Sequence, residues 1–167
     1  MKTTISALVE NHPGVLARVA GLFSRRGFNI DSLVVGTTET PDISRMTIVV
    51  EGDEHVVEQV KKQLNKLIDV IKVSSIAPEE SVRRELVLIK VDADAKTRKD
   101  IVSITEIFRA NIVDVSKKSM IIELTGDKDK VTAFEELLRP FGIKELVRTG
   151  IIAMNRGNKT IKIEEED

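Results

Sequence analysis

Four residues near the amino terminus, Asn11-His12-Pro13-Gly14, combine residue types that suit a loop around a small charged ligand. Proline fixes φ and glycine lacks a Cβ, so the segment favours a turn whose backbone a ligand can approach closely. The uncharged amide of Asn11 offers hydrogen-bond donors and acceptors, and Asn29 offers the same groups farther along the chain. These residues predict a site for a small zwitterion, although most loops of this composition are turns without a ligand.

A helix is predicted directly after this loop. Its apolar residues recur at helical spacing, namely Val15, Leu16, Val19, Leu22 and Phe23. Gly27 is placed to end the helix, because the residue after a helix often needs a positive φ. The first N–H groups of a helix have no internal partners and lie at the positive end of its dipole. The loop before the helix is therefore suited to hold a carboxylate or phosphate.

The composition excludes several classes of function. The chain has 167 residues and a net charge of −1, which does not suggest a nucleic-acid partner. It contains no Cys and only two His, His12 and His55, so we expect neither a disulfide framework nor a metal site. We identify no catalytic residue, and His12 is interpreted as a turn residue. No apolar run has the length of a membrane span, and the amino terminus starts a strand rather than a signal peptide, so we expect a cytoplasmic protein.

The first half of the chain predicts the order strand, helix, strand, strand, helix, strand. The strands are expected at 3–10, 29–38, 44–51 and 70–74, and the helices at 15–26 and across 56–68. Asp53 is placed to cap the second helix. This is the order of the ferredoxin-like α+β fold, in which two helices cover one face of a four-stranded antiparallel sheet.

The same order repeats in the second half of the chain. Strands are expected at 86–91, 111–116, 120–125 and 145–154, and helices across 101–108 and 131–138. Gly-Leu-Phe at 21–23 corresponds to Glu-Ile-Phe at 106–108, and Glu-Gly-Asp at 51–53 corresponds to Thr-Gly-Asp at 125–127. Two copies of one small fold, each a βαββαβ domain, is the economical interpretation.

We therefore divide the chain into four segments. These are a first domain at 1–76, a linker at 77–83, a second ferredoxin-like domain at 84–157 and a mobile acidic tail at 158–167. The second domain has the charged, glycine-free segment 92–100 where the first has its glycine-containing loop. If either domain binds a small ligand, we expect it to be the first.

Several segments carry a resemblance to a known family. Residues 10–30, followed by Ser44-Arg45-Met46-Thr47-Ile48 and 56–73, are similar to the N-terminal ACT domain of the small, regulatory subunits of acetolactate synthase (acetohydroxyacid synthase). The second half, including 105–110 and Thr149-Gly150, resembles the C-terminal domain of the same family. The resemblance covers nearly the whole chain.

The resemblance implies a non-catalytic subunit. It implies that the subunit activates a separate catalytic subunit and confers feedback inhibition by valine. The partner is expected to use thiamine diphosphate, Mg²⁺ and FAD to condense pyruvate with a second 2-oxo acid, at the start of branched-chain amino acid biosynthesis. None of these cofactors is expected in this chain.

The family also implies where an effector binds. Its ACT domains pair side by side, with valine between the helix-entry loop of one protomer and the start of the second strand of the other. The matching residues here are Asn11, Gly14 and Asn29, with Val15, Leu16 and Ile30 as neighbours that supply backbone amides or an apolar wall. An edge strand invites pairing with a second copy, so we expect a homodimer. One methylene changes binding in a pocket by only ~1 to 3 kcal/mol, so leucine and isoleucine are expected as weaker effectors.

Two other classes of function remain open from the residues alone. A stand-alone RNA-binding or adaptor module is the alternative, because RNA-recognition domains share this order of elements. Such domains stack bases on strand aromatics, whereas all five Phe lie in or beside predicted helices. A self-contained enzyme would need a nucleophile, a base and an orienting group, and the sequence suggests no such set.

Overall fold

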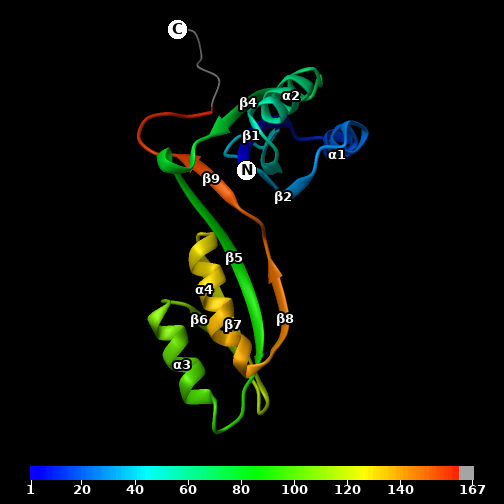
Figure 1. The fold of residues 1–167 in the computed structure, drawn as a ribbon. Helices are drawn as coiled ribbons and strands as arrows, with labels where there is room; N and C mark the ends of the chain where they lie inside the picture. Colours follow the sequence, from blue (N-terminus) through cyan, green and yellow to red (C-terminus); the bar gives the residue numbers. More distant parts are fainter. Residues whose placement is uncertain (162–167) are drawn as a thin grey trace. The chain divides into compact units, whose positions relative to one another are not determined.

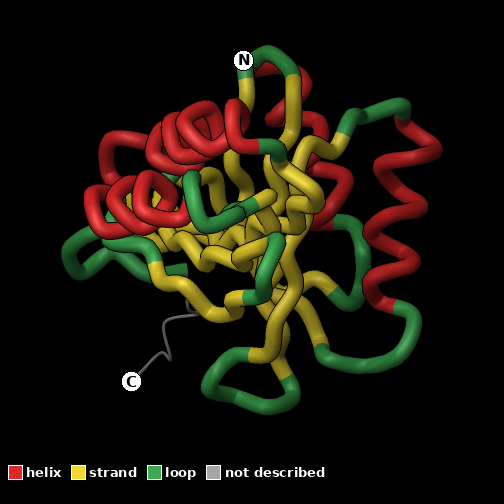
Figure 2. Tube along the Cα trace, turned by 90° about the horizontal axis from the view of Figure 1, so that it is seen from below, coloured by secondary structure: helices red, strands yellow, loops and turns green. Residues whose placement is uncertain are grey.

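The computed structural model of the protein describes residues 1–161. These residues form two compact units. One consists of Met1–Val82 and the described residues from Ile151 onward, and the other of Arg83–Gly150. Figure 1 labels most of their helices and strands, and Figure 2 distinguishes helix, strand and loop along the same chain.

The first unit has the predicted βαββαβ order. Its elements are β1 (Lys2–Glu10), α1 (Val15–Arg26), β2 (Ile30–Thr37), β3 (Ile43–Glu51), α2 (Glu54–Asn65), β4 (Val70–Ile76), the 3-10 turn η1 (Pro78–Glu80) and β9 (Ile152–Asn155). The sheet order is β2-β3-β1-β4, and neighbouring strands are antiparallel. Val19, Phe23 and Val60 from the helices join Ile5 and Ile48 from the strands in one buried core.

The second unit repeats this plan. Its elements are β5 (Ser81–Asp92, which starts in the first unit), α3 (Arg98–Ile107), β6 (Asn111–Val115), β7 (Ser119–Gly126), α4 (Lys128–Leu138), the 3-10 turn η2 (Arg139–Phe141) and β8 (Ile143–Arg148). The order β6-β7-β5-β8 matches that of the first sheet strand for strand. Ile101 and Phe134 pack on Ile89 and Ile122 in its core. The predicted fold class, two ferredoxin-like α+β repeats, is confirmed.

Gly27 ends α1 and Asp53 caps the start of α2, as the sequence predicted. Gly27 follows α1 with a φ of 67°, and the next amide, that of Phe28, donates to the Phe23 carbonyl. This is the Schellman arrangement, which needs a left-handed residue at the glycine position. Asp53 accepts a hydrogen bond from the Val56 amide at the start of α2. Asp127 does the same for Lys130 in α4.

The face of the first sheet that points away from the helices is also covered. Ser6 and Thr47 lie on this face and are 0% and 3% exposed. The chain from Ile151 to Ala153 is bonded to the same face, because the Ile151 amide donates to Ser32 Oγ at 3.2 Å and Arg45 donates to the Ala153 carbonyl at 2.8 Å. The sequence did not indicate this covering segment.

One predicted strand is wrong. The sequence suggested a single strand at 145–154, but the structure has β8 and β9, separated at Gly150, whose φ is 93°. An extended strand cannot pass through a left-handed residue without turning. By their contacts, Ile151 and the described residues after it group with the first compact unit.

The two remaining predicted segments also have structure in part. The expected linker at 77–83 contains the turn η1 and the first residues of β5. Of the expected mobile tail at 158–167, residues 162–167 lie outside the described residues, whereas Ile161 is buried. No helix among the described residues is long and apolar enough to cross a membrane.

Loss of the Asp53 cap gives a direct test of how the first unit is held together. Asp53→Ala is expected to lower the free energy of unfolding by about 1 kcal/mol, because the Val56 amide loses its acceptor. Asp53→Asn keeps an acceptor and is expected to change it by much less. Urea unfolding followed by circular dichroism measures both, and equal losses in the two variants would contradict the capping role.

Candidate functional site

The start of α1 is open to an anion. Gly14 precedes the helix with a φ of 90°, and no side chain caps the first turn. Its carbonyl accepts the first intrahelical bond, from the Arg18 amide at 3.0 Å. Within residues 1–161 no acceptor is bonded to the amides of Val15 or Leu16. These amides and the positive end of the helix dipole can therefore stabilise a carboxylate.

Asn11 holds the loop and keeps an acceptor for a ligand. Its backbone amide donates to the Asp42 carbonyl at 2.8 Å, and its side-chain Nδ2 donates to the Pro41 carbonyl at 2.9 Å. These bonds tie the loop after β1 to the turn between β2 and β3. In the described part of the chain, no donor is bonded to Asn11 Oδ1, and the residue is exposed. That oxygen can accept a hydrogen bond from an ammonium group.

The apolar residues predicted beside the loop differ in exposure. Val15 is buried in the core and can offer a ligand its backbone amide but not its side chain. Leu16 is 48% exposed on the first turn of α1, so its side chain is available as an apolar wall. Ile30 is half-buried and packs against the core at the start of β2.

The two predicted halves of the site lie at opposite ends of the same sheet. Asn11 follows β1 at the end where Glu10 pairs with Ile43. Asn29 precedes β2 at the other end, where its carbonyl accepts a bond from Glu51. Because β1 and β2 are both antiparallel to β3, they run in the same direction, and their opposite ends cannot share one small ligand. One chain alone does not bring Asn11 and Asn29 together.

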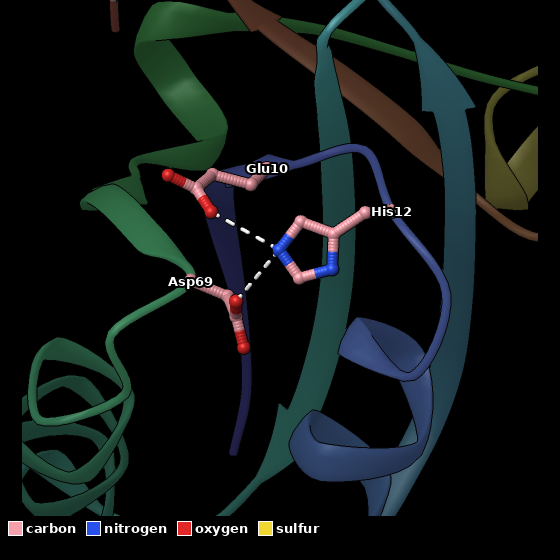
Figure 3. Close-up of side chains that lie close together, drawn as sticks. All are labelled: Glu10, His12 and Asp69. Atoms are coloured by element: carbon pink, nitrogen blue, oxygen red, sulfur yellow. Dashed lines mark hydrogen bonds and ion pairs between the residues drawn. The ribbon is translucent and has the colours of Figure 1, made fainter.

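A charged cluster lies beside the loop (Figure 3). His12 Nε2 is 2.9 Å from Asp69 Oδ1 and 3.1 Å from Glu10 Oε2, and both carboxylates point toward its ring. Its other ring nitrogen, Nδ1, lies 3.3 Å from the Pro13 carbonyl oxygen. The sequence interpretation of His12 as a simple turn residue missed these partners.

Asp69 is the buried centre of this cluster. Its side chain is 6% exposed, and its Oδ2 accepts a hydrogen bond of 2.6 Å from Arg18 Nε. Its backbone carbonyl accepts the Glu10 amide at 2.9 Å. A buried carboxylate is tolerated only with such partners, because burial removes its hydration. Asp69 therefore connects the end of β1 and the first turn of α1 to the start of β4.

The contacts of the cluster shift two pKa values in opposite directions. The hydrogen bonds to the Pro13 carbonyl and to Glu10, helped by the charges of Asp69 and Glu10, raise the pKa of His12 above its ordinary value of 6.5. The Arg18 hydrogen bond and the charges of Arg18 and His12 lower the pKa of Asp69. The cluster thus favours the protonated form of His12 and the ionised form of Asp69.

Glu10, His12 and Asp69 also offer three metal-ligand atoms within 4.8 Å of one another. The sequence predicted no metal site and did not group these residues. Arg18 already neutralises part of the negative charge of Asp69, and a proton on His12 neutralises more. The cluster is therefore explained as an ion-pair network that needs no metal ion.

The corresponding loop of the second unit is built differently. Asp94 Oδ1 accepts from the amides of Lys96 and Thr97, at 2.8 and 3.0 Å, just before α3. In the second unit, a carboxylate of the chain itself is thus bonded to amides of the turn before the helix, whereas the loop before α1 carries no such carboxylate bond within the described residues. A cavity of about 480 Å³ beside it is lined by Ala95, Arg98, Val115, Ser116 and Lys117.

The pH dependence of the cluster can be measured at His12. A raised folded-state pKa means that the stabilising ion pairs with Asp69 and Glu10 are fully present below pH 6.5 and are lost as pH rises through that folded-state pKa. An NMR titration of the His12 ring is expected to give a midpoint above 6.5. Asp69→Asn is expected to lower this midpoint, and an unchanged midpoint would contradict the coupling.

Comparison with known proteins places these features in a family. Residues 84–157 match the model for the small subunit of acetolactate synthase, and residues 5–72 match that of the AHAS small subunit-like ACT domain. A probable acetolactate synthase small subunit of Archaeoglobus fulgidus is 70% identical over 95% of this chain and 99% of its own length. The crystal structure of the Thermotoga maritima acetolactate synthase small subunit is 49% identical, with a TM-score of 0.90 over 95% of this chain and 99% of its own. The chain therefore belongs to the family of acetolactate synthase small subunits.

Proposed function

We propose that this chain is the regulatory subunit of an acetolactate synthase and that its ACT domain binds valine as a feedback inhibitor. The observation that supports this most is the uncapped start of α1 behind Gly14, beside the free acceptor of Asn11. The chain activates a catalytic subunit, and bound valine reverses that activation. The cofactors thiamine diphosphate, Mg²⁺ and FAD are assigned to the partner, and none of them to this chain.

The chemistry of the loop fits a small apolar amino acid. The valine carboxylate binds the amides at the start of α1, where the helix dipole favours negative charge. The ammonium group donates to Asn11 Oδ1. The isopropyl group rests on an apolar surface that includes the exposed side chain of Leu16. These three contacts need a free carboxylate, a free ammonium and a short branched side chain on one molecule.

A homodimer completes the site in this proposal. β2 is an edge strand, and an unpaired edge offers its backbone groups to a second copy. Antiparallel pairing of two β2 strands about a two-fold axis places the Asn29 end of one strand against the Thr37 end of the other. Thr37 is at the end of the sheet where Asn11 lies. The two-fold operation thus brings Asn11 of one protomer toward Asn29 of its partner, twice per dimer.

The alternative as an RNA-binding module receives no support from the first sheet. An RNA-recognition domain exposes a sheet face with aromatic residues for stacking. Here the corresponding face carries Ser6 and Thr47, which are buried, and the chain from Ile151 to Ala153 is bonded to the same face. A nucleic acid would have to displace that segment first.

Calorimetry with valine tests the effector site. Valine is expected to bind saturably, with weaker binding of leucine, and Asn11→Ala is expected to weaken valine binding about tenfold by removing a hydrogen bond to a charged group. Asn111→Ala is the control. It removes an exposed asparagine from the second unit, at the start of β6, away from the proposed effector site. Equal effects of the two substitutions would contradict the assignment.

Reconstitution with the catalytic subunit of the same organism tests the regulatory role. The wild-type chain is expected to raise the rate of acetolactate formation, and valine is expected to lower it again. The Asn11→Ala variant is expected to activate without conferring valine sensitivity. A chain that binds the catalytic subunit but never changes its rate would contradict the proposal.

Mixed dimers test whether the site lies between protomers. Asn11→Ala and Asn29→Ala chains are each expected to bind valine weakly as pure proteins. After the two are mixed and exchanged, a heterodimer contains one site with both asparagines and one with neither. Valine binding at wild-type affinity, at one site per heterodimer, is expected to return. Failure to recover it, although mass spectrometry shows the heterodimer, would contradict a site formed by Asn11 of one protomer and Asn29 of its partner.

A further inference from the structure

Arg18 presents a fixed, unsatisfied guanidinium at the start of α1. Its Nε donates to Asp69 Oδ2 at 2.6 Å, and Asp69 is itself held in place by burial. No residue other than Asp69 within 1–161 accepts a hydrogen bond from this guanidinium. The Arg18 side chain is 47% exposed, so its remaining N–H groups are open to solvent or to a ligand. A pairing through Nε leaves the two terminal nitrogens available for a second acceptor.

The same guanidinium lies over Gly14. A Cβ built on Gly14 would be 3.1 Å from Arg18 Nη1, 3.7 Å from Cζ and 3.9 Å from Nη2. The space that the missing side chain leaves at the helix entry is therefore occupied by a cation rather than by open solvent. The terminal nitrogens of Arg18 therefore lie at the helix entry, beside the residue that precedes the open amides of Val15 and Leu16.

The charged groups around Arg18 bind one edge of its guanidinium and leave its other N–H donors free within the described residues. Asp69 takes one edge of the guanidinium, while its other oxygen faces His12 Nε2 at 2.9 Å. Glu10 also faces His12, at 3.1 Å. His12 thus occupies the second oxygen of Asp69, and the outer edge of Arg18 keeps its donors for an external anion.

We propose that Arg18 binds the α-carboxylate of the effector and that Asp69 is its positioning residue. This inference rests on the proposed function and adds a residue and a chemical requirement to it. The ligand class is an α-amino acid with a free carboxylate, because planar, charge-assisted hydrogen bonds from a guanidinium match a carboxylate and not a neutral amide.

The test changes the residue and the ligand together. Valine and valinamide differ at the carboxylate, so their ratio of affinities reports any group that binds it. At pH 7 the wild-type protein is expected to bind valine about tenfold to hundredfold more tightly than valinamide, the range of a hydrogen bond to a charged group. In Arg18→Gln this ratio is expected to fall several-fold, to the preference that the amides and the dipole of α1 provide, with valine binding weakened and valinamide binding unchanged.

Arg25→Gln is the matched control. Arg25 lies on the same helix, and its Nη1 is likewise 3.1 Å from a Cβ built on the glycine four residues before it, Gly21. It is not at the helix entry, so its substitution is expected to keep the wild-type ratio. Asp69→Asn is a second variant, which retains the cation but loosens its hold, and is expected to reduce the ratio partially.

The outcomes separate this inference from the proposed function. An unchanged ratio in Arg18→Gln, with valine and valinamide weakened equally or not at all, would overturn the assignment of Arg18. If Arg18→Gln does not fold, as judged by circular dichroism, the ratios in Arg18→Lys and Asp69→Asn decide in the same way. Failure of the wild-type chain to bind valine would overturn the proposed function, and this inference with it.

Discussion

The constraint on which the first unit depends most is the buried carboxylate of Asp69. A carboxylate that is 6% exposed must be paired, and its nearest partner, Arg18, is on the first turn of α1. The Asp69 carbonyl accepts the last amide of β1 as well. One residue therefore fixes the strand before the loop, the helix after it and the entry to β4. The loop from Asn11 to Gly14 has little freedom between these fixed points, which is what a preorganised binding site requires.

The second constraint is the direction of the strands. Because β1 and β2 run the same way, the loop residue Asn11 and the strand-start residue Asn29 are separated by the length of the sheet. No movement of side chains can bring them to one ligand. In the proposed dimer, a two-fold axis perpendicular to β2 resolves the separation, and a site shared in this way links dimerisation thermodynamically to effector binding. A ligand held by both protomers stabilises the dimer, and the dimer raises the affinity for the ligand.

The features that the sequence predicted correctly depend on neighbours in the chain. The positive φ of Gly27 and the cap of Asp53 follow from the helix ends to which they belong. The pairs that the sequence missed join distant residues, since Arg18 and Asp69 are 51 positions apart and Ser32 and Ile151 are 119 apart. Arg18 and Arg25 are seven residues apart and so share one face of the helix, and nothing in their local sequence distinguishes them. Only the tertiary fold shows which of the two arginines faces a buried carboxylate.

The position of Gly150 shows why the two repeats are not independent modules in this chain. After this glycine the backbone returns to the first unit, where Ser32 bonds to Ile151 and Arg45 bonds to Ala153. The covered face bears small hydroxyl residues such as Ser6, which pack closely under a backbone but would bury little apolar area by themselves. A fragment cut at 77–83 lacks the segment that covers this face. Residues that follow the second unit therefore complete the fold of the first. The segment that leaves the second unit is bonded to Ser32 of β2, and β2 is the edge strand to which the proposal assigns the dimer contact.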